Sequence, residues 1–290
     1  MADMLDHPSR PSAVGSVPLI GWILIGASAI TLVLTSASRG LISTTPDIYS
    51  AAVFDTIESA AAFALAAALV SGAGRWQPGR KRLLAGAVAF AVAGVLQLAY
   101  RSWFAAWQTE PRVLSDIETA TLVARAFLEA GAMAAGTWLA AIGLWQSRPR
   151  HATGGRAAVV IGVAAVLALV GTMAVGASGM QAGPGIALNV TQNLLLAIVS
   201  MATAFLAIAA SRYRPIGHHL PELAIGLGAF TILVMTGVRQ WALAITLGED
   251  LSLEAAEIVF GVPMLLSAIG LVLLIIGFAS GRNASSAGRG

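Results

Sequence analysis

Charged side chains inside long apolar runs are the residues of this sequence that are best placed to do chemistry. Arg125 and Glu129 lie near the middle of the apolar run 117–145, four residues apart, so they share one face of a helix. Charges at such depth are costly in a membrane, and they usually pair with one another or line a water-filled path. Two interpretations stay open: a self-neutralising structural pair, or part of a site for an anionic or zwitterionic ligand.

A second group of polar residues lies toward one end of the apolar runs. Asp55 and Glu58 are three residues apart and share a helix face. Arg101 lies at a matching depth in the next run, where pairing with Asp55 or Glu58 would relieve two desolvation costs together. Because burial favours the protonated form of a carboxyl group, Glu58 or Glu129 is the expected proton- or cation-responsive residue.

The structural alternative is that these charges only lock helices together. In that interpretation, Arg101 and Arg239 extend toward the membrane interface beside Trp103 and Trp241. The full set of ligand or ion-pathway candidates is Arg125, Glu129, Asp55, Glu58, Arg101, Glu118, Arg239, Glu257, Asn189 and Gln192.

Several kinds of chemistry are excluded by the residues that the chain lacks. It has no cysteine, which excludes disulfides, thiolate nucleophiles and iron–sulfur clusters. Its histidines all lie outside the apolar runs, so neither a bis-histidine haem site nor an intramembrane zinc site is expected. Nucleotide-binding glycine motifs in their strand context and a carboxylate cluster for Mg²⁺ are also missing. We therefore expect no catalytic residue, no metal, no cofactor, and a protein that is not an enzyme.

Composition predicts that the chain is an integral membrane protein. Hydrophobic residues make up 57% of its 290 residues and charged residues 11%, with a mean hydropathy of +0.81. A soluble domain usually has about 25% charged residues, so this chain cannot cover a water-facing surface. The net charge of +3 comes from basic residues in short loops, which favours the lipid bilayer and not nucleic acid as the partner. A homo-oligomer or a membrane partner protein is also compatible with the sequence.

Eight apolar runs, each long enough to cross a bilayer, predict an all-α fold with eight transmembrane helices. Polar tails are expected at 1–17 and 281–290. The predicted spans are 18–38, 50–72, 83–106, 117–145, 157–178, 186–210, 222–246 and 254–280.

Basic residues alternate between successive loops and predict the orientation of the chain. The breaks after the second, fourth and sixth runs are rich in arginine, whereas the other loops carry few basic residues. Since short cytoplasmic loops are enriched in Lys and Arg, both termini are expected on the cytoplasmic side. The alanine-rich composition is typical of a high-GC bacterium, for which the plasma (inner) membrane is the expected location.

Similar motifs in the two halves predict a tandem repeat of four helices each, over 18–148 and 149–280. The sequence Arg101-Ser102-Trp103 recurs as Arg239-Gln240-Trp241, at an offset of 138 residues (239 − 101). Four is an even number, so the copies would have the same orientation in the membrane. The alternative is a chance alignment of helices that are all rich in Ala, Leu and Val.

Two functions from different classes fit these features. The first is a small-solute or ion transporter, or a channel-like protein, with an outward-facing polar vestibule. The second is a non-catalytic membrane subunit or sensor, in which the charges fix helix packing and an outer groove binds a partner protein or lipid.

Overall fold

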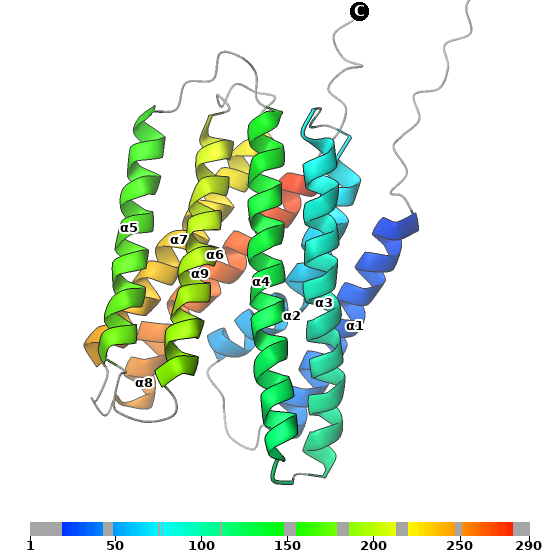
Figure 1. The fold of residues 1–290 in the computed structure, drawn as a ribbon, viewed down its shortest axis with the longest axis vertical. Coiled ribbons are helices and arrows are strands. Elements are labelled where there is room, and N and C mark those ends of the chain that lie inside the picture. Colours follow the sequence, from blue (N-terminus) through cyan, green and yellow to red (C-terminus); the bar gives the residue numbers. More distant parts are fainter. Residues whose placement is uncertain are drawn as a thin grey trace, which may run out of the picture.

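The computed structural model describes residues 19–42, 49–74, 76, 78–110, 112–147, 155–178, 186–212, 220–246 and 251–280, all of which belong to helices or their connections (Figure 1). The polar tails predicted at 1–17 and 281–290 lie outside the described residues. The helices are α1 (Leu19–Ile42), α2 (Tyr49–Gly72), α3 (Arg80–Thr109), α4 (Asp116–Gln146), α5 (Gly155–Ser178), α6 (Ile186–Ser211), α7 (Leu220–Thr246), α8 (Leu253–Ala256), the π-helical turn η1 (Glu257–Gly261) and α9 (Val262–Ala279).

Among the described residues, eight helices are long and apolar enough to span a membrane, which confirms the multi-pass helical fold predicted from the sequence. The last span is one continuous run of α8, η1 and α9. The two longest helices are α3, with 30 residues, and α4, with 31. At about 1.5 Å per residue each is roughly 45 Å long, more than the 30 Å or so of a hydrocarbon core. Both therefore project beyond their neighbours at the lower end in Figure 1.

The first turn of α4 has its own local cause. Ser115 is the N-cap residue: its side chain accepts a hydrogen bond from the backbone N–H of Glu118, and the Glu118 side chain bonds back to the Ser115 backbone. This reciprocal pair satisfies backbone donors that the first turn of a helix leaves without partners. The helix consequently starts at Asp116, in a segment that is more polar than the span it leads into.

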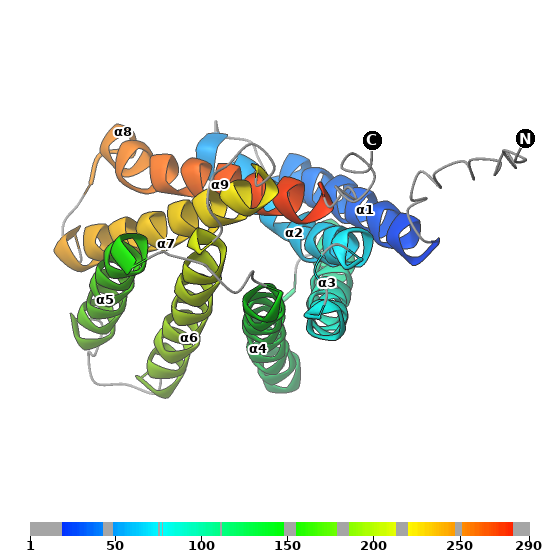
Figure 2. The ribbon, with the colours of Figure 1, turned by 90° about the horizontal axis from the view of Figure 1, so that it is seen from above.

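Viewed from above, the helices form two rows (Figure 2). One row contains α5, α6, α4 and α3, and the other contains α7, α9, α2 and α1. Within the first half of the chain α1 packs on α2 and α3 on α4; within the second half α5 packs on α7 and α7 on α9. The two halves meet where α4 packs on α6 and where α2 packs on α9.

Small residues allow these helices to approach closely. A Cβ atom added to Gly228 of α7 would lie 2.6 Å from the carbonyl oxygen of Gly270 in α9, and one added to Gly86 of α3 would lie 3.1 Å from the carbonyl oxygen of Gly136 in α4. Between transmembrane helices there is no hydrophobic driving force, so close packing of this kind is a main source of association.

The backbone of the last span is irregular where the sequence places Gly261-Val262-Pro263. The π-helical turn η1 ends at Gly261, and Pro263 sits in the first turn of α9. Proline lacks the N–H that would continue the α-helical hydrogen bonding, and its ring clashes with the carbonyl four residues earlier, so a local change of helix geometry at this point is expected.

The start of α1 and the end of α9 lie at the same end of the bundle (Figure 1). We call this the basic end, because the arginine-rich breaks after α2, α4 and α6 follow helix ends located there. The opposite end, where α2 begins, is the distal end. Which end faces the cytoplasm stays a prediction.

Replacing Gly228 by alanine should destabilise the protein. The new methyl group would collide with backbone atoms of α9, and overpacking of this kind costs about 1–3 kcal/mol. Gly162→Ala in α5 is the matched control, because a Cβ there meets no atom within 4 Å. Thermal unfolding of both variants in detergent would test this, and equal midpoints for the two variants would contradict the packing described here.

The absence of cysteine makes the orientation testable by labelling. We expect Ser43→Cys and Glu249→Cys to react with a membrane-impermeant maleimide on intact cells, and Gly74→Cys and Thr153→Cys to react only after permeabilisation. Gly74 is suitable because a Cβ there meets no atom within 4 Å, whereas at Gly79 it would lie 1.9 Å from the carbonyl oxygen of Gly143. The reverse labelling pattern would invert the predicted topology.

Candidate functional site

A cavity of about 380 Å³ lies between the two halves of the molecule, and we call it the central cavity. It is lined from the first half by α2, α3 and α4, and from the second by α6, α7 and α9; α1 and α5 contribute no lining residue. Its polar lining residues are Glu58, Thr137, Thr203, Thr236, Arg239, Gln240 and Ser267.

A second cavity of about 500 Å³, the side cavity, adjoins the first. Its lining comes from α2, α3, α4 and α6, and includes Gln97, Arg125 and Glu129. The two cavities share four lining residues, namely Glu58, Met133, Leu196 and Val199. Glu58 is the only charged residue among these four, so its carboxylate stands at the boundary between the two spaces.

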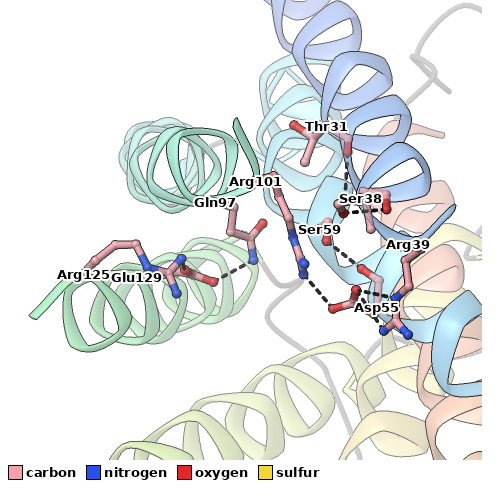
Figure 3. Close-up of polar contacts among 10 residues, drawn as sticks. Thr31, Ser38, Arg39, Asp55, Ser59, Gln97, Arg101, Arg125 and Glu129 are labelled. Carbon is pink, nitrogen blue, oxygen red and sulfur yellow. Dashed lines mark hydrogen bonds and ion pairs between the residues drawn. The ribbon is translucent and has the colours of Figure 1, made fainter. Parts of the chain in front are cut away.

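Asp55 is held between two arginines (Figure 3). Its Oδ1 atom accepts a hydrogen bond from Nη2 of Arg101 at 2.6 Å, and its Oδ2 atom lies 3.1 Å from Nη2 of Arg39. Of the two carboxylates whose depth matches Arg101 in the sequence, Asp55 is the one that pairs with it. This trio ties α1, α2 and α3 together near the distal end, and charge-assisted hydrogen bonds of this length are the strong ones.

Arg125 and Glu129 also pair, but not in isolation. Nη1 of Arg125 lies 2.5 Å from Oε2 of Glu129, while Nε2 of Gln97 donates to Oε1 of the same carboxylate at 2.8 Å (Figure 3). The guanidinium of Arg125 stacks over the ring of Tyr100, 4.1 Å from its centroid. The carboxylate of Glu129 is thus compensated by a cation and an amide, which ties α4 to α3.

Gln97 and Arg101 place both networks on one face of α3. They are four residues apart, which makes them neighbours on a helix surface. Two buried polar atoms of this region, Oε1 of Gln97 and Nε of Arg125, have no hydrogen-bond partner in the described part of the chain. Gln97 is only 8% exposed, so this oxygen is a buried acceptor beside the side cavity that Gln97 lines.

Glu58 and Arg239 differ from the residues above. Within the described ranges neither side chain has a hydrogen bond or an ion pair, although both line the central cavity. The charges that act on Glu58 come from Asp55 on its own helix, Arg239 on α7, Glu129 on α4 and Arg101 on α3. Asp55, Glu129 and Arg101 are already engaged in the networks described above. Glu58 and Arg239 are therefore two charges of opposite sign that have no direct partner in the part of the chain that the structure describes.

Two other predicted candidates, Glu118 and Glu257, are not brought into this site. Glu118 pairs with Arg112 and completes the capping box of α4. Its carboxylate therefore stabilises the first turn of this helix, in an exposed segment. Glu257 lies in η1 and lines a shallow surface pocket together with Glu254, Ile258 and Val262. The side chains of Asn189 and Gln192, in the first turns of α6, lie outside the described residues.

Hydroxyl groups in the central cavity were not singled out from the sequence. Thr137, Thr203, Thr236 and Ser267 each donate to the carbonyl oxygen four residues earlier in their own helix, at 2.8–2.9 Å. Each hydroxyl oxygen consequently keeps lone pairs with which it can accept a hydrogen bond. Such residues are common in membrane helices and their sequence context gives no signal, so only the fold brings them together.

Neutralising Asp55 should lower the free energy of unfolding, whereas neutralising Glu58 should not. Asp55→Asn leaves two arginines without their counter-ion, and hydrogen bonds to charged groups contribute about 1.5–3 kcal/mol each. Glu58→Gln removes a charge that has no direct partner, so the free energy of unfolding should be unchanged or higher. Chemical unfolding followed by tryptophan fluorescence would measure both. A loss of stability in Glu58→Gln as large as in Asp55→Asn would show that Glu58 is part of the structural network.

Comparison with known proteins identifies no family for this chain. No protein-family model matches the sequence, and neither a curated protein nor a solved structure matches it significantly. The candidate site therefore rests on geometry alone, in a chain whose eight apolar helices indicate a multi-pass membrane protein.

Proposed function

We propose that this protein is a small-solute transporter whose substrate binds in the central cavity. The observation that carries the proposal is the position of that cavity between the two halves of the chain, with an unpaired carboxylate from one half and an unpaired guanidinium from the other. Secondary transporters commonly bind their substrate near the bilayer midplane, at the interface between repeats that rock against each other.

A duplicated four-helix architecture is part of the proposal, and the helix packing supports it. We match α1 with α5, α2 with α6, α3 with α7 and α4 with α9. Under this matching, the contact of α4 with α6 corresponds to the contact of α9 with α2, and these are the two contacts between the halves. In the view from above, the same matching exchanges the two rows (Figure 2). The expected symmetry axis then runs along the membrane normal and passes between the halves.

Glycine contacts support the duplication at the level of single residues. A Cβ on Gly86 would meet the carbonyl oxygen of Gly136, the Cβ of Leu139 and the backbone nitrogen of Ala140. A Cβ on Gly228 would meet the same three kinds of atom, in Gly270, Leu273 and Leu274. These pairs imply an offset of 142 residues (228 − 86) between α3 and α7, and of 134 (270 − 136) between α4 and α9.

This register differs from the 138 suggested by the Arg-x-Trp motif. At an offset of 142 the equivalent of Arg239 is Gln97 (239 − 142), so Arg101 and Arg239 would not be matching residues. The duplication is therefore better supported by packing than by the motif that first suggested it.

The proposal also includes the orientation of the chain in the membrane. With both termini in the cytoplasm of a cell bounded by the plasma membrane, the distal end faces outward. Asp55 and Glu58 belong to the first turns of α2, which begins at that end, so the charged part of the site would be reached from outside.

The alternative is a non-catalytic membrane subunit or sensor. It is favoured by the ion pairs around Asp55 and Glu129, because charges that neighbouring helices neutralise fix packing and need no ligand. Glu58 and Arg239 are not explained in this way, which is why transport is preferred.

Reconstitution into liposomes tests the transport function. We expect gradient-driven uptake of at least one member of a panel of labelled amino acids, amines, carboxylates and alkali cations. Glu58→Gln and Arg239→Gln should each lower the initial rate roughly tenfold or more, since each removes a charge from the binding site. Thr137→Trp, which fills the cavity without changing a charge, should do the same. Glu257→Gln and Arg112→Gln are the matched controls, and their rates should stay near that of the wild type.

Two outcomes would count against transport. One is folded, correctly inserted protein that moves no solute of the panel under any gradient. The other is a set of cavity variants with the same rates as the controls. Co-purification of a stoichiometric membrane protein together with either outcome would support the subunit interpretation.

A further inference from the structure

We infer that the central cavity takes an amphipathic zwitterion, a small organic molecule with an ammonium group, a carboxylate and an apolar body. The inference rests on the proposed transport function and names its substrate class. It assigns the ammonium group to Glu58 of α2 and the carboxylate to Arg239 of α7.

The two charged side chains of the cavity are the first evidence for a zwitterionic ligand. Glu58 and Arg239 line the same space and act on each other electrostatically, yet they form no ion pair, and neither bonds to another residue in the described ranges. A charge without a partner inside a membrane protein is costly and usually marks a path or a ligand site. If the two side chains had only to neutralise each other, direct contact would be the more stable arrangement. Their separation instead leaves room for a ligand that compensates both.

Simple ions fit this pair less well. A monovalent cation bound at Glu58 would leave Arg239 uncompensated and would be repelled by it, and an anion bound at Arg239 would meet the opposite problem with Glu58. A molecule that carries both charges avoids both penalties. Arg125 and Glu129 are not the site for it, because they compensate each other and Glu129 also accepts from Gln97.

The rest of the cavity wall indicates the chemical character of the uncharged part of the ligand. Most of the lining is apolar, with Leu, Met, Phe and Ile side chains from both halves of the chain. A volume of about 380 Å³ is near the lower end of the roughly 300–1,000 Å³ typical of small-molecule sites, so it suits one small molecule. The flexible thioethers of Met235 and Met264 adapt to differently shaped apolar groups. Ions and strongly hydrated polyols would gain nothing from such a wall.

Binding of matched probes tests the inference. The probes are phenylalanine with 2-phenylethylamine and 3-phenylpropanoate, and leucine with 3-methylbutylamine and 4-methylpentanoate; within each set the molecules share an apolar body and differ in their charged groups. Calorimetry on the purified full-length protein in nanodiscs gives each affinity. For the wild type we expect each zwitterion to bind at least about tenfold more tightly than the amine or the carboxylate of its set.

The variants connect each charge of the ligand with one side chain. Glu58→Gln should abolish the preference for phenylalanine over 3-phenylpropanoate, because the ammonium group no longer has a counter-ion. Arg239→Gln should abolish the preference for phenylalanine over 2-phenylethylamine. Glu58→Asp and Arg239→Lys keep the charges and should restore part of each preference, which separates charge recognition from a loss of folding. Glu257→Gln and Arg112→Gln should behave as the wild type.

The inference is overturned if neither zwitterion binds at millimolar concentration, if an amine or a carboxylate binds as tightly as the zwitterion of its set, or if Glu58→Gln and Arg239→Gln leave the preferences unchanged. Uptake by proteoliposomes separates this failure from failure of the proposed function. Flux of a different solute that depends on Glu58 or Arg239 would retain transport and exclude the zwitterion, whereas the absence of any flux would exclude transport itself.

Discussion

The absence of water from the hydrocarbon core is the constraint on which the rest of this structure depends. Backbone groups must be bonded within their own segment, which in this chain means helices, and each charge needs a partner inside the protein. Asp55 meets the second requirement with Arg101 and Arg39, and Glu129 meets it with Arg125 and Gln97. Against that background Glu58 and Arg239 stand out, because the protein compensates its other charges near the cavities directly.

The sizes of the side chains explain both the close packing of the helices and the central cavity. Where Gly and Ala face each other, as between Gly228 and Gly270, backbones come into contact and leave no space. Between the halves, α2 buries an alanine-rich face, including Ala60, Ala62 and Ala66, whereas larger side chains and hydroxyls of the other helices surround an open volume. The tight seams give the helices fixed positions, and the cavity between them can therefore hold its two charges apart.

The sequence predicts the number of spans well, because length and hydropathy determine which segments can cross a membrane. It also places Arg101 at the depth of the two carboxylates of α2, which makes a pairing between them possible. It could not decide between Asp55 and Glu58, nor identify Arg39 as a second partner, since depth does not determine which way a side chain faces around the helix axis. Glu118 shows the same limit: its spacing from Ser115 fits a capping box, but its place in an apolar run suggested a path.

If the two halves are copies, the register implied by the glycine contacts would account for the absence of a partner for Arg239 among the described residues. At offsets of 142 and 134, Gln97 corresponds to Arg239, and Glu129 corresponds to Pro263 (263 − 134). In the first half the amide of Gln97 is bonded to the Glu129 carboxylate across α3 and α4. In the second half the matching position of α9 offers a proline, which has neither a charge nor a side-chain acceptor, next to a π-helical turn. If the halves are copies, one has kept its polar groups bonded to each other, while the other presents a cation to the cavity. A ligand carboxylate would then occupy the place that Glu129 fills in the first half.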